Sequence, residues 1–416
     1  MTRIPAPVTV LLAAMCGVGG SAIARGIAAT AAATPPGPAP TRSATAPFTL
    51  DHNRMFVEVE FTRADRSIRR ARAWVDTGNE VIVLAEPLAR DLGLDLSSLK
   101  TGETRHSVES ASETPPMSVG GMPLDVEGVA TRILPGTHLR AGVSVEVQLP
   151  ASALRRGHVV LDYPARRLTI ATAGVLKPRG TAIPCRVNPG TGLFMIAATI
   201  DGETVWLGVD NGSAGTWVSQ TLTTAWQKRH PDWPYASGAA GSANFFGFPF
   251  ESQGVLMSLS ELGLGNLWAR DVAVLGLDQS LFDWYSKKSA GPVLGFIGAN
   301  VLKNFRVEID FPGQMTWWEA GPPPVDRDLD IVGLTLRPEP GGGVTVAGVV
   351  TRDGRPLVEG VRPGDRLLRV GPLDTSTAAM GVAVDALRGR PGETRELVVE
   401  RDGARHTLEA KVVRLP

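Results

Sequence analysis

Two segments of the sequence repeat each other, and this duplication limits the fold more than any other feature. Residues 149–164 align with residues 297–312 at an offset of 148, with Ala, Leu, Val, Asp and Pro identical at five of the sixteen positions. Upstream, residues 75–78 align with residues 209–212 at an offset of 134, so the second copy is fourteen residues longer between the two landmarks. Repeats of about 120 to 140 residues are too long for a solenoid and predict two homologous lobes.

Length and composition predict a third domain behind these lobes. The chain has 416 residues, which at roughly 100 to 200 residues per domain predicts two to four domains. Eight of the nine Trp lie between Trp206 and Trp318, whereas residues 319–416 contain no Phe, Tyr or Trp. A chain breaker, Gly321-Pro322-Pro323-Pro324, lies at this change of composition. We therefore expect a first lobe at 47–174, a second lobe at 175–320 and a C-terminal domain at 326–416.

The charge balance argues against a nucleic-acid partner. Lys and Arg number 42, as do Asp and Glu, so the formal net charge is zero. A chain without net charge has no long-range field that attracts phosphates, which disfavours binding by counterion release. The six His residues are scattered, without an H-E-x-x-H motif or a Cys cluster, so we expect neither a metal site nor a cofactor.

The N-terminus has the three parts of a signal peptide. Arg3 supplies the positive charge, residues 8–18 form an apolar stretch, and Ala22-Ile23-Ala24 matches an A-x-A cleavage site. We expect residues 1–24 to be removed on export and the mature protein to be periplasmic or secreted. A lipoprotein anchored through Cys16 is the alternative, and it is disfavoured because a bulky Met precedes this Cys.

Beyond the signal peptide, the sequence predicts a chain without a transmembrane anchor. No other stretch reaches about 18 uninterrupted apolar residues, the length that a membrane-spanning helix needs. Residues 25–46 are rich in Ala, Thr, Pro and Gly, and we expect a disordered linker there. Only Cys185 remains after cleavage, so an internal disulfide is excluded, and we expect this thiol to be buried as a small apolar side chain.

Each copy contains an Asp-x-Gly motif between two apolar strands, followed by a helical segment. The second strand and the helix are expected at 81–84 and 87–94 in the first copy, and at 216–218 and 221–228 in the second. A single Asp-Thr-Gly is usually an ordinary turn capped by its own side chain. Two copies in a duplicated frame indicate more, because their carboxyl groups would meet, and two carboxyl groups in contact cannot both be ionised.

Two carboxyl groups that share one proton can supply both an acid and a base. The ionised member activates a water, and the protonated member donates to the carbonyl oxygen of a peptide bond. This chemistry hydrolyses a peptide bond without a metal or a cofactor. Asp76 and Asp210 are therefore the candidate catalytic pair. A serine hydrolase is disfavoured, because Ser213 lies between glycines without the G-x-S-x-G spacing.

The residues around these motifs resemble the retropepsin-like aspartic proteases of the exported bacterial type. The similar segments are 74–78 (Trp-Val-Asp-Thr-Gly), 208–213 (Gly-Val-Asp-Asn-Gly-Ser), 294–302 and 307–311, and the resemblance covers residues 47–320. It implies a mostly β structure in which two six-stranded, retropepsin-like β-barrel lobes form a pepsin-like bilobal body. It also implies that one chain builds the whole site, so we expect a monomer that acts on polypeptides without a cofactor.

The same resemblance assigns roles within the two motifs. Asp76 and Asp210 would be the catalytic dyad of an aspartic endopeptidase. The active-site turns would be supported by Thr77, Gly78, Asn211, Gly212 and Ser213.

Three positions depart from the family pattern. Asn211 stands where a Thr or Ser hydroxyl braces the two turns, Asn79 stands where Ala or Ser is usual, and Pro150 stands where the second copy has Gly298. An amide can still donate and accept hydrogen bonds, but in a different geometry. An active hydrolase is the first hypothesis, and a catalytically inactive peptide-binding protein on the same scaffold is the alternative.

Gly-rich segments lie in the interval where each lobe of this family places a β-hairpin flap over the substrate. They are residues 113–121 in the first copy and 238–249 in the second. Phe245, Phe246 and Phe248 would line an apolar substrate pocket in one interpretation and belong to the core of the second lobe in the other.

The C-terminal domain at 326–416 resembles a PDZ domain, with residues 360–370 as the specific part and a helix expected at 377–388. Such domains bind an extended peptide by strand addition and hold its terminal carboxylate in backbone amides. By this resemblance, Gly333 and Leu334 belong to the carboxylate-binding loop, and C-terminal or extended peptides are the expected partners. A generic β-rich interaction domain is the alternative interpretation.

Overall fold

The described part of the chain is mostly β, as the sequence predicts. The computed structural model describes residues 43–96, 109–111, 114–134, 145–238, 254–322, 328–339 and 342–416. The expected signal peptide, most of the expected linker and the three Phe of the second Gly-rich segment lie outside these ranges. No described helix is both long enough and apolar enough to cross a membrane.

The first repeat consists of short strands, one helix and one 3-10 turn. Its elements are β1 (Ser43–Asp51), β2 (Arg54–Thr62), β3 (Ile68–Asp76), β4 (Ile82–Ala85), α1 (Glu86–Asp91), β5 (Glu109–Ala111), β6 (Met117–Val119), β7 (Met122–Pro123), β8 (Thr131–Leu134), β9 (Val147–Pro150), η1 (Ala151–Ala153), β10 (Gly157–Asp162) and β11 (Arg167–Thr172). β2 and β3 form the hairpin that the alternation of apolar and charged residues predicts. β9 runs parallel to β3, and β4 runs antiparallel to β9 and parallel to β8.

The second repeat has the same strand connectivity. Its elements are β12 (Thr181–Val187), β13 (Phe194–Ile200), β14 (Glu203–Val209), β15 (Thr216–Ser219), α2 (Gln220–Arg229), β16 (Tyr235–Ser237), β17 (Val255–Leu264), β18 (Leu267–Leu277), α3 (Gln279–Ser286), β19 (Gly295–Ile297), α4 (Ala299–Leu302), β20 (Phe305–Asp310) and β21 (Met315–Ala320). β13 pairs with β14, β19 runs parallel to β14, and β15 runs antiparallel to β19 and parallel to β18. These pairings match those of β2, β3, β9, β4 and β8, so the duplication extends from the sequence to the strand order.

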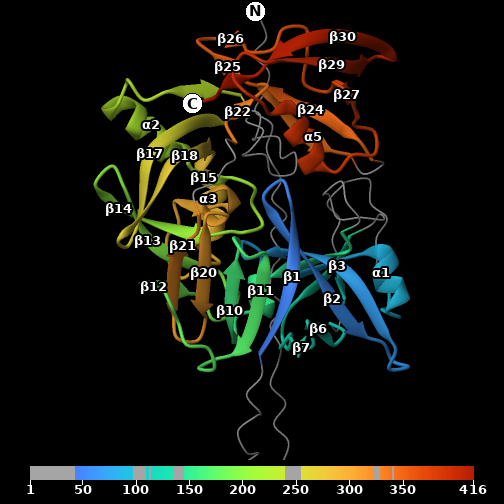
Figure 1. The fold of residues 1–416 in the computed structure, drawn as a ribbon. Helices are drawn as coiled ribbons and strands as arrows, with labels where there is room; N and C mark the ends of the chain where they lie inside the picture. Colours follow the sequence, from blue (N-terminus) through green and yellow to red (C-terminus); the bar gives the residue numbers. More distant parts are fainter. Residues whose placement is uncertain are drawn as a thin grey trace, which may run out of the picture. The chain divides into compact units, whose positions relative to one another are not determined.

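One antiparallel sheet joins the two repeats, with β10 and β20 side by side at its centre (Figure 1). The strand order is β1-β11-β10-β20-β21-β12. Across the central pair, Asp162 lies opposite Arg306, and Asp310 lies opposite His158. Positions 162 and 310 are equivalent at the sequence offset of 148, as are positions 158 and 306. The register of the shared sheet is therefore symmetrical, with each repeat contributing the same strands.

Glu308 lies at the centre of this symmetrical register, opposite its equivalent Val160. Its side chain is 0% exposed and forms ion pairs with His158 Nε2 at 2.8 Å and Arg306 Nη1 at 2.7 Å. Burial alone would raise the pKa of Glu308, but hydrogen bonds from His158 and Arg306 lower this pKa below its ordinary value. The second repeat thus supplies a buried charge at a position where the first repeat supplies an apolar side chain.

The C-terminal segment forms a separate sheet in the order β23-β24-β27-β29-β30. Its elements are β22 (Asp330–Ile331), β23 (Leu334–Pro338), β24 (Val344–Val349), β25 (Thr351–Arg352), β26 (Arg355–Pro356), β27 (Arg366–Val370), β28 (Leu373–Asp374), α5 (Met380–Leu387), β29 (Thr394–Arg401), β30 (Ala404–Lys411) and β31 (Val413–Arg414). Among the described strands only β24 pairs with β23, and α5 packs against β23 and β27. The expected helix and the two expected final strands are present.

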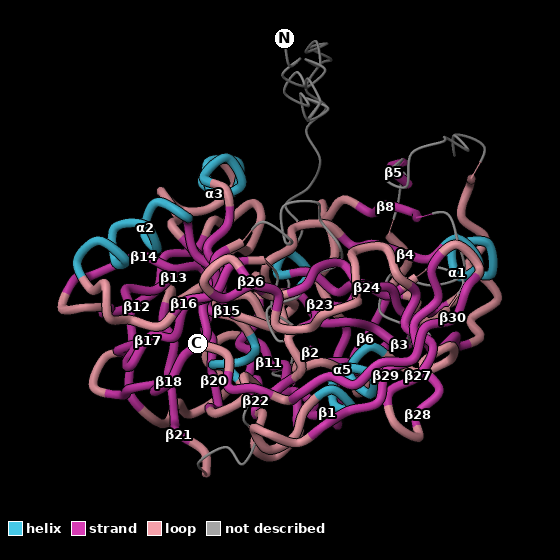
Figure 2. The backbone as a smooth tube through the Cα atoms, turned by 90° about the horizontal axis from the view of Figure 1, so that it is seen from above, coloured by secondary structure: helices cyan, strands magenta, loops and turns pink. Residues whose placement is uncertain are grey.

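The C-terminal segment contacts both repeats. β25 pairs with β16 of the second repeat through Thr351 and Ser237, and buried apolar residues of both form one cluster. In the first repeat, the turn between β1 and β2 lies beside α5 (Figure 2). There Asp51 Oδ1 accepts a hydrogen bond from the Gly381 N–H at 2.6 Å. Asp51 thus satisfies one of the free N–H groups in the first turn of α5.

The expected linker is shorter than predicted. Residues 43–46 belong to β1 and pair with β11, where Ala46 lies opposite Leu168. Ala46 is also buried in the core. The neighbouring strand orders these residues, and such long-range pairing is not encoded in the local Ala, Thr and Pro composition.

The prediction of a flap at 113–121 is wrong. The described part of this segment leads into a hairpin of β6 and β7 that turns at Gly120 and Gly121, both with positive φ. β6 pairs with Glu60 and Phe61 of β2, at the end of the β2–β3 hairpin that lies away from the Asp-x-Gly turn. The Gly-rich composition predicts a hairpin correctly, but the strand pairing places it elsewhere. The corresponding segment of the second repeat, 239–249, lies outside the described residues.

Candidate active site

The first Asp-x-Gly motif lies at the end of β3. The C-terminal half of this strand is buried, and the chain turns directly after Asp76. Asp76 Oδ1 accepts a hydrogen bond from the Gly78 N–H at 3.0 Å, and Asp76 O accepts one from the Asn79 N–H at 3.3 Å. The Asp side chain therefore caps its own turn, as short polar side chains do at turns.

The second motif follows β14 in the same way. The Asp210 N–H donates to Ile297 O of β19 at 3.0 Å, which fixes the start of the turn. Asp210 Oδ1 accepts hydrogen bonds from the N–H groups of Gly212 at 2.9 Å and Ser213 at 3.2 Å. The two turns thus cap themselves in the same pattern at equivalent positions of the two repeats.

The two turns bring Asp76 and Asp210 into contact. A Cβ atom at Gly78 would lie under 3.0 Å from the Asp210 carboxylate, and a Cβ atom at Gly212 would lie under 3.0 Å from the Asp76 carboxylate. Asp76 is 6% exposed and Asp210 is 5% exposed. The two carboxyl groups hydrogen-bond to each other. Glycine is required in both turns, because any side chain there would displace the opposite carboxylate.

Thr77 and Asn211 brace the two turns against each other. Thr77 Oγ1 donates to Val209 O at 2.8 Å and accepts a hydrogen bond from the Asn211 N–H at 3.1 Å. In the opposite direction, Asn211 Oδ1 accepts a hydrogen bond from the Thr77 N–H at 2.8 Å. Both side chains are buried. The amide oxygen of Asn211 therefore fills the acceptor role that the family resemblance gives to a hydroxyl.

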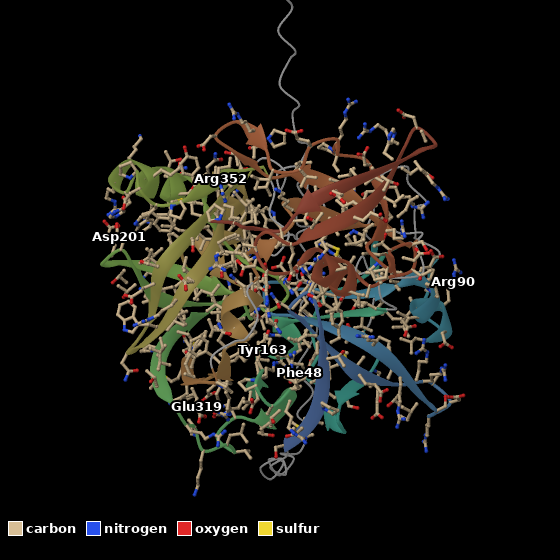
Figure 3. The ribbon with its side chains drawn as sticks, turned by 45° about the horizontal axis from the view of Figure 1, so that its top comes forward. Phe48, Arg90, Tyr163, Asp201, Glu319 and Arg352 are labelled. Carbon is tan, nitrogen blue, oxygen red and sulfur yellow. The ribbon has the colours of Figure 1, made fainter. Side chains whose placement is uncertain are left out.

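Tyr163 directly follows β10 and lies near Asn211. Its ring packs edge-on against Phe48, with the ring centroids 5.6 Å apart (Figure 3). Its hydroxyl interacts with the Asn211 side chain. Burial raises the pKa of Tyr163, and Asn211 opposes this rise. The equivalent residue of the second repeat is Phe311, so the first turn has no matching hydroxyl.

Burial raises the pKa of both carboxyl groups. Burial raises the pKa of Asp76, while hydrogen bonds from Gln148, Asp210 and Gly78 and the charge of Arg54 oppose the rise. The pKa of Asp210 is raised well above its ordinary value, first by burial and then by the negative charge of Asp76. Two buried carboxyl groups in contact titrate as a coupled pair that shares one proton.

Sequence analysis missed Gln148, which lies on β9 beside β3. Gln148 Nε2 donates a hydrogen bond to Asp76 Oδ2. One signal in the sequence could have identified it: Gln148 aligns with Phe296 at the offset of 148, inside the segment that resembles the family. Gln148 and Phe296 are thus a difference between the two copies, just as Pro150 and Gly298 are.

Arg54 and Tyr285 also lie near the dyad and were not predicted. Arg54 on β2 is 1% exposed, and its charge opposes the rise that burial causes in the pKa of both Asp51 and Asp76. Tyr285 on α3 packs against Phe296, with ring centroids 4.7 Å apart. Burial raises the pKa of Tyr285 well above its ordinary value, and the charges of the two Asp residues add to this rise. Nothing in the local sequence distinguishes either residue.

The structure accounts for the other two departures from the family pattern. Asn79 Nδ2 donates to Val81 O at 2.6 Å and Asn79 Oδ1 accepts from the Glu80 N–H at 2.9 Å, so this side chain closes the next turn. A Cβ atom at Gly298 would collide with Gly215 O. Pro150 instead has φ −85° directly before η1, a conformation that suits proline.

The expected carboxylate-binding loop of the C-terminal segment consists of Gly333, which lies between β22 and β23, and Leu334, the first residue of β23. Gly333 O accepts a hydrogen bond from the Val350 N–H at 2.9 Å, and the Leu334 N–H donates to Val332 O at 2.6 Å. Leu334 is buried. These contacts order the loop beside the N-terminus of β23.

Cys185 and the possible metal ligands are the remaining groups considered from the sequence. Cys185 is 5% exposed, and burial raises the pKa of its thiol to about 12, as expected for a small apolar side chain. Within the described ranges, no three residues of the types His, Cys, Asp and Glu come together as a metal-binding group.

The comparisons with known proteins give a similar solved structure but no family. No protein-family model matches the chain, and no curated protein matches it. Among solved structures, a retropepsin-like aspartic protease from Rickettsia conorii is similar to this chain, with 16% sequence identity and a TM-score of 0.23. The similarity covers 32% of this chain and 92% of that chain. At such values the geometry of the two turns, and not the likeness, carries the functional interpretation.

Proposed function

We propose that this protein is an aspartic endopeptidase that hydrolyses peptide bonds with a water activated by Asp76 and Asp210. One observation carries the proposal: two buried carboxyl groups hydrogen-bond to each other, and each occupies the same place in one copy of a duplicated frame. Two carboxyl groups in contact hold one proton between them, which is the ionisation state that acid and base catalysis by a pair requires.

In the proposed reaction, each carboxyl group has a separate task. The ionised Asp76 removes a proton from the water as the water oxygen bonds to the carbonyl carbon of the substrate. Asp210 gives its proton to the carbonyl oxygen, so that a neutral diol forms. When the C–N bond breaks, Asp76 gives its proton to the leaving nitrogen, and Asp210 takes a proton back from the diol. Atoms and charges balance without a co-reactant.

Rigid turns support this chemistry. Gly78 and Gly212 leave room for the carboxylates, and the hydrogen bonds between Thr77 and Asn211 fix one turn relative to the other. Preorganised groups reduce the reorganisation that the reaction requires, which is a large part of enzymatic rate acceleration. The two repeats on one chain supply both halves of the site, which supports a monomeric enzyme on a pepsin-like bilobal frame.

The C-terminal segment is proposed to act as a PDZ domain that recruits peptide termini or regulates access to the dyad. In its favour, β23 has no described partner on the edge that faces away from β24, and α5 packs beside it. An extended peptide that adds to this edge would lie between β23 and α5. Gly333 and Leu334 lie at the N-terminal end of β23, and we propose that they contact the terminal carboxylate of such a peptide. Export to the periplasm or medium completes the proposal and depends on the N-terminal signal alone.

A catalytically inactive peptide-binding protein is the second candidate. The departures at Asn79 and Asn211 favour it, because neither residue is the usual one of the family beside the carboxylates. In this second candidate, the two Asp-x-Gly turns would have only a structural role, and peptides would bind at the edge of β23.

The test is the digestion of an unfolded, fluorescently labelled protein by the purified mature chain across acid to neutral pH. The wild type should cut it, and Asp76→Ala and Asp210→Ala should each lower kcat/KM at least about 1,000-fold, since each removes half of the acid and base pair. Asp232→Ala, at an exposed position, is the matched control. Absence of wild-type turnover together with retained binding of peptides would establish the second candidate instead.

A further inference from the structure

The two repeats place different side chains at the same position next to the dyad. In the first repeat, Gln148 on β9 lies opposite Trp74 of β3, and in the second repeat Phe296 on β19 lies opposite Gly208 of β14. These positions are equivalent at the offset of 148. Gln148 reaches Asp76 Oδ2 with its amide, whereas the ring of Phe296 packs on Trp217, with centroids 4.7 Å apart.

The hydrogen bonds to the two carboxyl groups differ accordingly. Asp76 accepts from the Gly78 N–H on Oδ1 and from the Gln148 amide on Oδ2, so both of its oxygens face donors. Asp210 accepts from two backbone N–H groups, both on Oδ1. A carboxyl group whose two oxygens accept hydrogen bonds is best satisfied when ionised, because only the ionised form is a pure acceptor.

The polar side chains of the turns themselves do not supply this donor. Asn79 uses its amide on Val81 O and on the Glu80 N–H. Ser213 donates its hydroxyl to Gly215 O at 2.5 Å. Among the described side chains, the Gln148 amide is therefore the group that donates to Asp76 Oδ2, the oxygen that is not bonded to the Gly78 N–H.

We propose that Gln148 is a positioning residue that keeps Asp76 as the ionised, water-activating member of the dyad and leaves the shared proton on Asp210. This inference rests on the proposed aspartic protease activity and deepens it by assigning the two roles. A donor to the charged carboxylate lowers the free energy of the ionised state. Replacing that donor by an apolar side chain removes the preference, while Phe296 in the other repeat shows that the fold accepts an apolar residue at this position.

Other titratable groups also lie around the dyad. They are Arg54 on β2, Tyr285 on α3 and Tyr163 after β10. None of them is changed by a substitution at Gln148. A change in the pH dependence of a Gln148 variant therefore reports on the amide itself.

The first test is the pH profile of kcat/KM for Gln148→Met, which keeps the length of the side chain and removes the donor. We expect the acid limb of the profile to move to higher pH and kcat/KM on the acid side to fall about tenfold, with little change in KM, since a hydrogen bond to a charged group is worth about this factor. Gln148→His, which retains an N–H donor, should restore part of the loss. An acid limb that stays in place in Gln148→Met would overturn the proposal.

Phe296→Leu is the matched control from the other repeat. It alters packing beside the dyad without changing a donor, so we expect effects on KM and none on the position of the acid limb. A shift of the limb equal to that of Gln148→Met would show that packing, not the amide, sets the titration.

A second measurement does not require activity. Carbon-13 NMR of labelled Asp carboxyl groups should show Asp76 ionising at lower pH than Asp210 in the wild type. The reverse order would overturn the proposal even if the enzyme is active. If the wild type lacks proteolytic activity, but Asp76 still ionises at lower pH than Asp210 and Gln148→Met raises the pKa of Asp76, the positioning role stands. Only the proposed function then fails.

Discussion

The two Asp-x-Gly turns have the same backbone pattern and different neighbours. In the first turn Asp76 receives a side-chain donor from Gln148 and lies near the charge of Arg54. In the second turn, the donors to Asp210 among the described residues are backbone N–H groups, and the apolar Phe296 occupies the position equivalent to Gln148. Duplication therefore determines where the two carboxyl groups meet, and the residues that differ between the copies make these groups chemically unequal.

The largest expected effect tests what the two turns share. Gly78→Ala and Gly212→Ala should each lower kcat/KM about 1,000-fold, because each new methyl group would overlap the opposite carboxylate and displace it. The measurement is steady-state cleavage of a peptide substrate, with circular dichroism to confirm folding. Gly291→Ala is the control, since its nearest neighbour atom would lie 3.7 Å away. A large loss in only one of the two variants would show that the turns are not equivalent.

The next effect tests a position where the repeats differ. Glu308→Gln should lower the free energy of unfolding by about 3 kcal/mol near neutral pH, because it leaves buried basic partners without a carboxylate. The folded-state pKa of Glu308 is lowered, so its stabilisation is present above the unfolded-state pKa and is lost as the pH falls through the folded-state value. The difference between wild type and variant should therefore shrink towards acid pH.

Urea denaturation at several pH values measures this effect. Val160→Ala, at the equivalent position of the first repeat, is the matched control and should show a loss of stability that does not depend on pH. A loss in Glu308→Gln that stays constant from neutral to acid pH would contradict the role of its charge.

A smaller effect distinguishes the contributions of Thr77 and Asn211 to stability. Thr77→Val should lower the free energy of unfolding by about 2 kcal/mol, because it leaves Val209 O and the Asn211 N–H without their buried partner. Asn211→Thr should cost less, since a hydroxyl can still accept from the Thr77 N–H. Denaturant titration of both variants makes the comparison. Equal losses of unfolding free energy in the two variants would mean that Thr77 and Asn211 contribute equally to the contact between the turns.

The smallest effect concerns the hydroxyl that only the first repeat provides. Tyr163→Phe should lower the free energy of unfolding by about 1 kcal/mol, because the buried Asn211 side chain loses a polar neighbour. Phe311 shows that the shared sheet accommodates the phenyl ring at the equivalent position. Thermal unfolding measures the loss, and an unchanged melting temperature would exclude a supporting role for the hydroxyl.

The sequence predicts that the two Asp-x-Gly turns lie at equivalent places, because duplication is a long-range signal. Five identities at an offset of 148 and a second match at 134 are enough to place Asp76 and Asp210 at equivalent ends of strands. The same offset also relates the residues of the symmetrical register between β10 and β20. No local property of those strands indicates that they pair across the repeats.

The sequence does not predict the role of a residue when that role depends on a contact with a residue distant in the chain. Arg54 is the first residue of β2 and directly follows the polar residues 51–53, yet it is 1% exposed. Gln148 is compatible with the exposed face of a strand until its contact with Asp76 is known. The Gly-rich hairpin at 113–121 was assigned to the wrong end of the first repeat for the same reason: local composition predicts a turn but not its partner.

The turn between β1 and β2 contributes to two regions of the molecule. Asp51 accepts a hydrogen bond from the first turn of α5, and Arg54, three residues later, contributes to the electrostatic potential at Asp76. One short turn of the first repeat thus caps a helix of the C-terminal segment and supplies a positive charge that opposes the rise in the pKa of Asp76.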